Sequence, residues 1–156
     1  MNTWIIYDSK FGNTEKIAQA ITMALHDYST VHTLPVNKAN AFSLVNASDI
    51  DMLIVGCPTQ THGISPAMKS FLDKIPPNAL RGLPTVCFDT RLNSPRWISG
   101  SAAHNLARVL YEKGAYVVVK SESFFVGEAE GPLETGELDR AATWAQAVVT
   151  RLAVPQ

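Results

Sequence analysis

The stretch Trp4-Ile5-Ile6-Tyr7-Asp8-Ser9-Lys10-Phe11-Gly12-Asn13-Thr14 decides how this chain folds, because it joins a strand to a helix through a polar turn. The apolar run Trp4 to Tyr7 predicts a buried strand, and apolar residues at helical spacing follow from Ile17 to Leu25. The turn between them, Ser9 to Thr14, combines hydroxyls with a glycine. Amides at a helix start have no intrahelical acceptor and lie at the positive end of the helix dipole, so this turn predicts a phosphate site.

The turn matches neither of the common nucleotide-binding motifs. Gly12 is its single glycine, so there is no GxGxxG, and the GK[ST] of a Walker A loop is absent. A basic ligand such as Lys10 is not required, because backbone amides can neutralise the anion. The other interpretation is an ordinary strand-to-helix turn that Ser9 and Asn13 cap.

Short apolar runs alternate with helical patterns along the rest of the chain. The predicted strands are 4–7, 31–36, 52–55, 85–88, and 116–119 together with 124–126, with a possible interruption at 120–123. The predicted helices are 14–26, 42–47, one from Ser65-Pro66 to Ile75, one from Ser99 or Ser101 to Gly114, and 136–152.

Five strands that alternate with helices predict one domain over residues 1–156, with a parallel sheet and right-handed crossovers. Ligands of such α/β folds bind outside the carboxyl ends of the strands. We therefore expect the site in the loops 8–13, 57–64 and 89–98.

Composition excludes several classes of function. The formal net charge of -1 gives no electrostatic footprint for nucleic acid or an anionic membrane, and no apolar run reaches the roughly 18 residues of a membrane span. The two cysteines, Cys57 and Cys87, have no CxxC spacing, so we expect neither a metal site nor a disulfide. Cys57 is interpreted as a small core residue, and we expect a cytoplasmic location.

The second and third loops carry groups suited to a flat heteroaromatic ring. The second loop can present its backbone to the ring edge, and His62 could stack on the ring or lie in solvent. In the third loop, Trp97 could stack on the ring while Arg91 and Arg96 place cations at the mouth; otherwise Trp97 packs on the next helix and the arginines are solvated. The candidates in these two loops are Pro58, Thr59, Gln60, Thr61, His62, Gly63, Asp89, Thr90, Arg91 and Trp97.

Three stretches together resemble the flavodoxin family. They are residues 6–14 followed by Ile17-Ala18, then Gly56-Cys57-Pro58-Thr59, and Met68-Lys69-Ser70-Phe71-Leu72-Asp73. The resemblance follows the element order of the whole chain and is strongest over residues 4–75. In length the chain is similar to the short type of flavodoxin. It implies a flavodoxin-like three-layer α/β sandwich, a five-stranded parallel sheet of order 2-1-3-4-5, and bound FMN.

On matching positions, the resemblance implies that the first loop holds the FMN phosphate and the other two loops border the flavin ring. The implied phosphate residues are Ser9, Lys10, Phe11, Gly12, Asn13 and Thr14. A flexible peptide near His62-Gly63 would face flavin N5. The chain departs from the family pattern at Phe11, where a hydroxyl residue is common, in the third loop, and in its near-neutral charge.

The resemblance implies an electron carrier between partner proteins, a reductase and an acceptor, with no catalytic residue and a monomer or weak homodimer. Two alternatives stay open: an FMN-dependent NAD(P)H or quinone-type reductase, and a flavodoxin-like regulatory module that no longer binds flavin. A phospho-receiver domain is disfavoured, because Cys57 stands where its phosphorylated Asp would follow the third strand.

Overall fold

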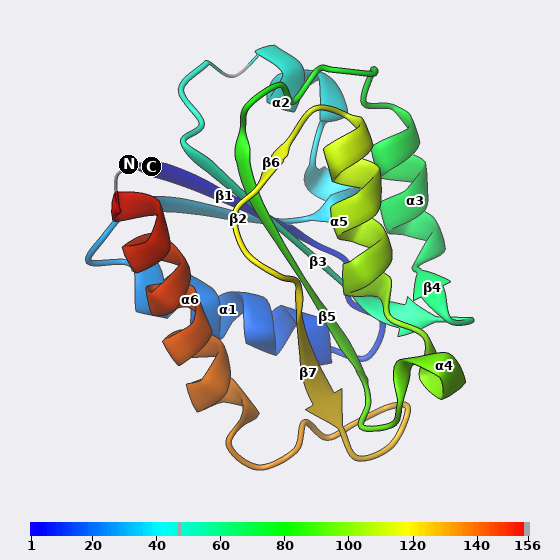
Figure 1. The fold of residues 1–156 in the computed structure, drawn as a ribbon. Helices are drawn as coiled ribbons and strands as arrows, with labels where there is room; N and C mark the ends of the chain where they lie inside the picture. The colour runs from blue at the N-terminus through cyan, green and yellow to red at the C-terminus, as the bar shows by residue number, and fades with distance from the viewer. Residues whose placement is uncertain (47, 155–156) are drawn as a thin grey trace.

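The computed structural model describes residues 1–46 and 48–154 and shows a central sheet covered by helices on both faces (Figure 1). The strands are β1 (Asn2–Tyr7), β2 (Thr30–Pro35), β3 (Met52–Gln60), β4 (Gly63–Ile64), β5 (Pro84–Leu92), β6 (Tyr116–Val117) and β7 (Glu122–Val126). The helices are α1 (Asn13–Leu25), α2 (Ala41–Asn46), α3 (Pro66–Asp73), α4 (Arg96–Ser99), α5 (Ala102–Glu112) and α6 (Glu137–Ala153), with a 3-10 turn η1 (Val36–Lys38).

The main sheet is parallel and runs in the order β2-β1-β3-β5-β6. β7 also pairs with β5, beyond the end of β6, so β6 and β7 form one interrupted fifth strand. This confirms the predicted order 2-1-3-4-5. The fifth strand is interrupted as predicted, but at residues 118–121 and not at 120–123. The short strand β4 is the exception, because it folds back antiparallel on the end of β3.

Each face of the sheet has its own hydrophobic core. On one face, Leu53 and Val55 of β3 pack with Leu72 of α3 and Leu106 of α5. On the other face, residues of α1 and α6 cover the sheet, including the fully buried Ile17. A central parallel strand with apolar side chains on both faces has this composition. Within the described ranges, no helix is both long and apolar enough to cross a membrane.

Gly56 is a glycine because a ring lies over its backbone. A Cβ at this position would lie 2.2 Å from Cζ of Phe88 on the neighbouring strand β5. The Phe88 ring packs edge-on against Phe124 and Trp144, with centroid separations of 6.0 and 6.3 Å. The Phe88 ring of β5 therefore occupies the space above the backbone of β3, and any larger residue at position 56 would displace this ring.

Two predicted loops begin later than expected, because strands continue into them. Residues 57–60 belong to β3 and residues 89–92 to β5, although both segments are polar. The extension of β5 follows from its pairing with β7, in which Phe88 to Leu92 align with Glu122 to Val126. The short helix predicted at 42–47 is observed as α2, and its last predicted residue, Ala47, lies outside the described residues.

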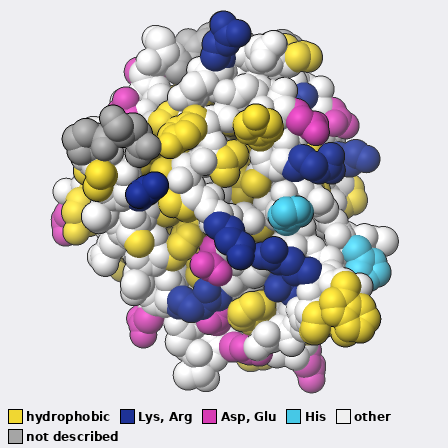
Figure 2. Space-filling model, in the orientation of Figure 1, with side chains coloured by type: hydrophobic (Ala, Val, Ile, Leu, Met, Phe, Trp, Pro, Cys, Tyr) yellow, Lys and Arg dark blue, Asp and Glu magenta, His cyan; other side chains and the backbone are white. Residues whose placement is uncertain are grey.

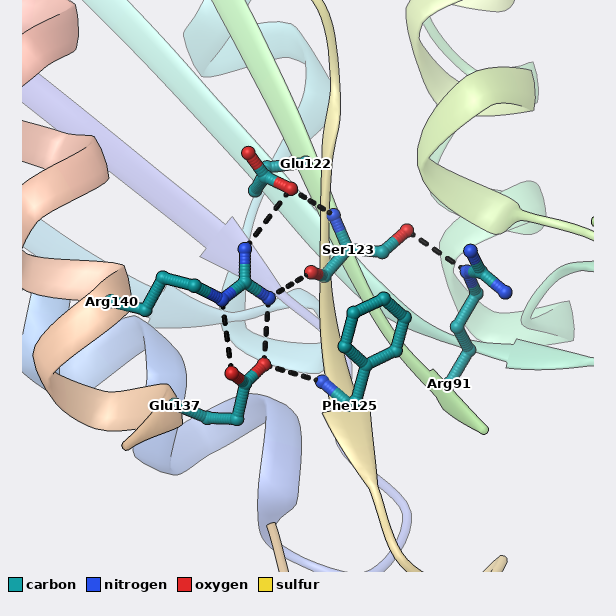
Figure 3. Close-up of polar contacts among 6 residues, drawn as sticks. All are labelled: Arg91, Glu122, Ser123, Phe125, Glu137 and Arg140. Atoms are coloured by element: carbon teal, nitrogen blue, oxygen red, sulfur yellow. Dashed lines mark hydrogen bonds and ion pairs between the residues drawn. The ribbon is translucent and has the colours of Figure 1, made fainter. Parts of the chain in front are cut away.

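An ion-pair network fastens α6 to the edge strand β7 (Figure 3). The Arg140 guanidinium pairs with Glu137 at 2.7 Å and with Glu122 at 3.1 Å, and it donates to the carbonyl of Ser123. Glu137 also accepts the amide of Phe125 at 2.7 Å. Burial raises the pKa of Glu137. The hydrogen bonds from Arg140 and Phe125, together with the Arg140 charge, outweigh this effect, so the pKa of Glu137 lies below the usual 4.5.

Replacement of Glu137 by Gln should therefore destabilise the protein in a pH-dependent way. A carboxyl with a lower pKa in the folded state stabilises the fold above its unfolded pKa, and this stabilisation is lost as pH falls through the folded pKa. We expect Glu137→Gln to lower the free energy of unfolding by about 2 kcal/mol at neutral pH. Urea titrations at a series of pH values should show this difference shrinking below the usual carboxyl pKa. A difference that stays constant into acid, or an equal effect of Glu134→Gln on the exposed loop, would contradict the assignment.

Candidate cofactor site

A cleft of about 530 Å³ lies at the carboxyl ends of β1, β3 and β5, where the sequence predicts the site. All three predicted loops contribute to its wall. The residues that line it are Lys10, Phe11, Asn13, Thr14, Pro58, Thr59, Gln60, Thr61, His62, Thr90, Arg91, Leu92, Ser94, Ile98, Ser99, Val126 and Ala129.

The first loop forms the turn into α1, whose buried first residues, Asn13 and Thr14, line the cleft. Gly12 precedes the helix with a φ of 89°, a left-handed conformation that favours glycine, and its would-be Cβ meets nothing within 4 Å. The Ser9 hydroxyl accepts the amides of Gly12 at 3.1 Å and Glu15 at 3.3 Å. Ser9 therefore shapes the turn, while the amides of Asn13 and Thr14, at the first two helix positions, have no intrahelical acceptor.

Two polar side chains of this turn hold neighbouring loops. The buried Thr14 hydroxyl lies 2.8 Å from the Thr90 hydroxyl of β5. The Asn13 amide donates to the carbonyl of Glu130 at 3.1 Å, which ties the loop after β7 to the rim of the cleft. The turn, β5 and the loop after β7 are therefore one connected wall.

The second loop is a tight hairpin with unusual backbone geometry. Gln60 pairs with Gly63, and the two residues between them, Thr61 and His62, have φ values of 48° and 66°. Both positive φ values fit a two-residue type I′ turn, which normally carries Asn-Gly. Both side chains line the cleft, so the sequence prediction placed them at the right end of the sheet.

Arg91 stands in the cleft wall with its guanidinium held in place. It donates to the Ser123 hydroxyl at 3.0 Å (Figure 3), to the Ser94 carbonyl at 2.6 Å and to the Ser99 hydroxyl at 3.0 Å. The same group lies 5.2 Å from the centroid of the Phe125 ring. All of these partners are uncharged, so the cleft wall carries a positive charge of fixed position.

Asp89 is not at the surface of the cleft, contrary to the expectation for the third loop. It is fully buried, and its Oδ2 accepts the Ser101 hydroxyl at 2.8 Å, the Ala103 amide at 2.9 Å and the Thr59 hydroxyl at 3.2 Å. It therefore holds the start of α5 against β3 and β5. The polar run that predicts a loop at 89–92 is in fact the end of a buried strand.

Trp97 also lies outside the cleft wall. Its side chain is 85 % exposed on α4, where it lines a separate shallow hollow with His62, Arg96 and His104. Figure 2 shows hydrophobic side chains over α4 at the lower right of this face, beside a histidine. Trp97 is therefore mostly exposed to solvent and outside the cleft wall, and its contact with a flavin ring stays a prediction. Ser9, Gly12 and Gly63 are likewise near the cleft without forming its wall.

Cys57 is a core residue, as the sequence predicts. It is fully buried, and burial raises the pKa of its thiol to about 12 although contacts with Ser65 act in the opposite direction. Burial likewise raises the pKa of the Cys87 thiol. Both thiols therefore stay protonated at neutral pH, and neither acts as a nucleophile.

Several lining residues escaped the sequence prediction. Leu92, Ser94 and Ile98 stand in the third predicted loop and Ser99 follows it directly, but nothing in their spacing separates them from their neighbours. Val126 ends β7 and Ala129 follows it, and this carboxyl end reaches the cleft because β7 pairs with the outer half of β5. The sheet order would have indicated this segment, since the fifth strand also ends at this edge.

The parallel order, the glycine turn after β1 and the cleft at the carboxyl ends define a flavodoxin-like α/β protein. A sequence model described as the flavodoxin domain matches residues 4–121. The chain belongs to the flavodoxin family, which places it among electron-transport flavoproteins at the level of the family. A comparison with curated protein sequences finds no match.

Solved structures with the same fold cover nearly the whole chain. A flavodoxin from the domain Archaea is 17% identical with a TM-score of 0.78, over 99% of this chain and 100% of its own. Flavodoxin 2 from Bacillus cereus is 21% identical with a TM-score of 0.81, over 97% and 99%. Rubredoxin oxygen:oxidoreductase from Desulfovibrio gigas is 24% identical with a TM-score of 0.73, over 98% of this chain and 37% of its own. At these identities the likeness shows the fold.

Removal of the Asp89 carboxylate should strongly destabilise the protein. Asp89→Ala would leave the Ser101 hydroxyl and the Ala103 amide without their buried acceptor, so we expect a loss of about 3 kcal/mol in the free energy of unfolding. Asp89→Asn should lose less, because the amide oxygen can accept the same bonds. Urea denaturation measures both, with Asp73→Ala on the exposed face of α3 as the control. Equal effects of Asp89→Ala and the control would show that the cluster contributes nothing.

Proposed function

We propose that this protein binds FMN in the cleft and carries electrons between a reductase and an acceptor protein. The observation that carries the proposal is the open, glycine-containing turn of Ser9 to Thr14 at the start of α1, on the wall of a cleft of about 530 Å³. Small-molecule and cofactor sites commonly have volumes in the range of roughly 300–1,000 Å³. We also propose that residues 1–156 act as one domain, in the cytoplasm, as a monomer or weak homodimer.

The donor set of the first loop fits a phosphate. The Ser9 and Thr14 hydroxyls already bond within the protein, and the Gly12 amide donates to Ser9, so the amides of Phe11, Asn13 and Thr14 would be the main phosphate ligands. Such amides bind anions at the positive end of a helix dipole. The exposed Phe11 in place of a hydroxyl residue is compatible with this arrangement, because its amide, and not its side chain, would contact the phosphate.

The flavin ring would lie between the second and third loops. Pro58, Thr59, Gln60, the Thr61–His62 turn and Gly63 would border one side, and Thr90 and Arg91 the other. Bound FMN supplies the electron transfer, and the chain's own residues bind and orient it. The fixed charge of Arg91 would favour the reduced, negatively charged ring.

The exposed position of Trp97 favours a carrier over a reductase. A reductase needs a substrate pocket over the flavin, which the Trp97 loop and the loop of residues 128–137 could form together. In the structure this indole stands in solvent and leaves the cleft open. Both cysteine thiols are buried, which supports a site without a nucleophile. The third possibility, a module that binds no flavin, is tested directly by titration with FMN.

Substitution of Gly12 should weaken FMN binding, and the chain offers a matched control. Gly12 and Gly136 each precede a helix with φ near 90° (89° and 86°), and a Cβ at either would meet nothing within 4 Å. We expect Gly12→Ala to reduce FMN affinity at least roughly tenfold, equivalent to about 1.4 kcal/mol, because its methyl group would stand in the phosphate site. Gly136→Ala should carry the same backbone strain and leave affinity unchanged.

Fluorescence quenching of FMN during titration into the ligand-free protein measures both dissociation constants. A yellow, stoichiometric complex of the unchanged protein is the first expected result. A protein that takes up no FMN would overturn the proposed function, and equal losses in the two glycine variants would overturn the phosphate assignment.

Neutralisation of Arg91 should make the reduction potential of bound FMN more negative. A charge interaction of about 1 kcal/mol at a partly exposed site corresponds to roughly 20 mV in a two-electron couple. We expect Arg91→Gln to show a shift of this order in a potentiometric titration and Arg91→Lys to keep most of the unchanged protein's potential. Equal shifts in the two variants would mean that the hydrogen bonds of Arg91, and not its charge, set the potential.

A further inference from the structure

We propose that Gly100 is a positioning residue for the cofactor site: it holds the strained Thr61–His62 turn in the shape that forms the cleft wall. The proposal rests on the proposed FMN site. Gly100 does not line the cleft and was not a candidate from the sequence. Its role follows from a backbone contact between Gly100 and His62, which lie 38 positions apart in the sequence.

The turn has a conformation that its own sequence does not favour. Thr61 and His62 have φ values of 48° and 66°, and a β-branched residue such as Thr61 rarely adopts a positive φ. Each such residue costs on the order of 1 kcal/mol and persists only where the surroundings impose it. Something outside the hairpin must therefore stabilise the turn.

The backbone of Gly100 contacts the turn and supplies this stabilisation. A Cβ built on Gly100 would lie 2.2 Å from the carbonyl oxygen of His62 and 2.6 Å from its Cα. The two backbones therefore touch, and no side chain fits between them. Gly100 itself has a φ of 74°, a conformation that L side chains rarely adopt, so glycine is required both by its own backbone and by the turn.

Hydrogen bonds of Gly100 and of its neighbour Ser101 hold this segment in place. The Gly100 amide donates to the Arg96 carbonyl at 2.7 Å, which closes α4. The next residue, Ser101, donates its hydroxyl to the buried Asp89 carboxylate at 2.8 Å and accepts the His104 amide at 3.4 Å as the cap of α5. The contact on His62 is therefore made by a segment bonded into the core, and not by a free loop.

This arrangement makes the turn a wall of fixed shape. Thr61 and His62 face the cleft while the His62 backbone rests on Gly100, so a residue with a Cβ at position 100 must push the turn toward the flavin position or distort it. We expect FMN affinity to depend on Gly100 although this residue never touches the cofactor. The exchange of the turn amides with solvent should depend on it as well, with or without FMN.

The test compares Gly100→Ala with Gly82→Ala. Both glycines have a φ of 74°, but a Cβ at Gly82 would meet nothing within 4 Å, so the control places alanine at the same positive φ without the contact. We expect FMN affinity to fall at least roughly tenfold in Gly100→Ala and to stay within roughly twofold in Gly82→Ala. In the ligand-free proteins, hydrogen exchange followed by NMR should show faster exchange of the amides of residues 61–63 in Gly100→Ala alone.

The two readouts separate this proposal from the proposed function. Failure of the unchanged protein to bind FMN would remove the proposed function, whereas the amide exchange of residues 61–63 would still decide whether Gly100 holds the turn. Equal affinity and equal exchange in the two alanine variants would overturn the role of Gly100.

A second pair of variants covers the case in which Gly100→Ala does not fold. Ser101→Ala keeps Gly100 and removes the hydroxyl that anchors it to Asp89, so exchange at residues 61–63 should still accelerate. The control is Ser29→Ala, whose hydroxyl bonds with Thr3 at 2.7 Å and the Met1 carbonyl at 2.9 Å, away from the cleft. No acceleration relative to this control would overturn the proposal.

Discussion

The buried carboxylate of Asp89 is the interaction on which the site end of this molecule depends. A single oxygen, Oδ2, accepts hydrogen bonds from Thr59 on β3 and from Ser101 and Ala103 at the start of α5. An acidic side chain at a helix N-terminus is favoured by the helix dipole, and a buried polar atom is tolerated where it is hydrogen-bonded, as Oδ2 is here. Two adjacent parallel strands and the helix that follows them are thereby held in one geometry at the edge where the cleft forms.

Several loops that form the cleft are joined by hydrogen bonds of polar side chains that the sequence predicts as ligand contacts. The Thr14 hydroxyl bonds with Thr90, Asn13 bonds with the loop after β7, and Arg91 is held by Ser94, Ser99 and Ser123. What remains for a cofactor is mainly backbone: the open helix start and the edge of the hairpin. A site formed from backbone groups on a bonded frame is already organised before a ligand arrives, which lowers the ordering cost of binding.

How far the sequence predicts this arrangement varies from one element to another. Apolar runs such as Met52 to Val55 predict their strands correctly, because a strand buried on both faces needs continuous hydrophobicity. The polar ends of β3 and β5 are predicted as loops, because their strand geometry comes from pairing with distant segments and not from local composition. The contact of Gly100 with His62 has no signal in the sequence, since it joins two backbones that only the sheet order brings together.

The sequence by itself determined the alternation of strands and helices and, through the family resemblance, the order of the sheet, and it predicts an anion site in the turn of Ser9 to Thr14. These features follow from local periodicity and from the unpaired amides of a helix start. Only the tertiary structure decided which candidate residues line the cleft. Asp89 is buried beside it, Trp97 is exposed to solvent, and Arg91 is held in its wall. Burial and hydrogen-bond partners arise from segments far apart in the chain, so residue type and spacing alone do not specify them.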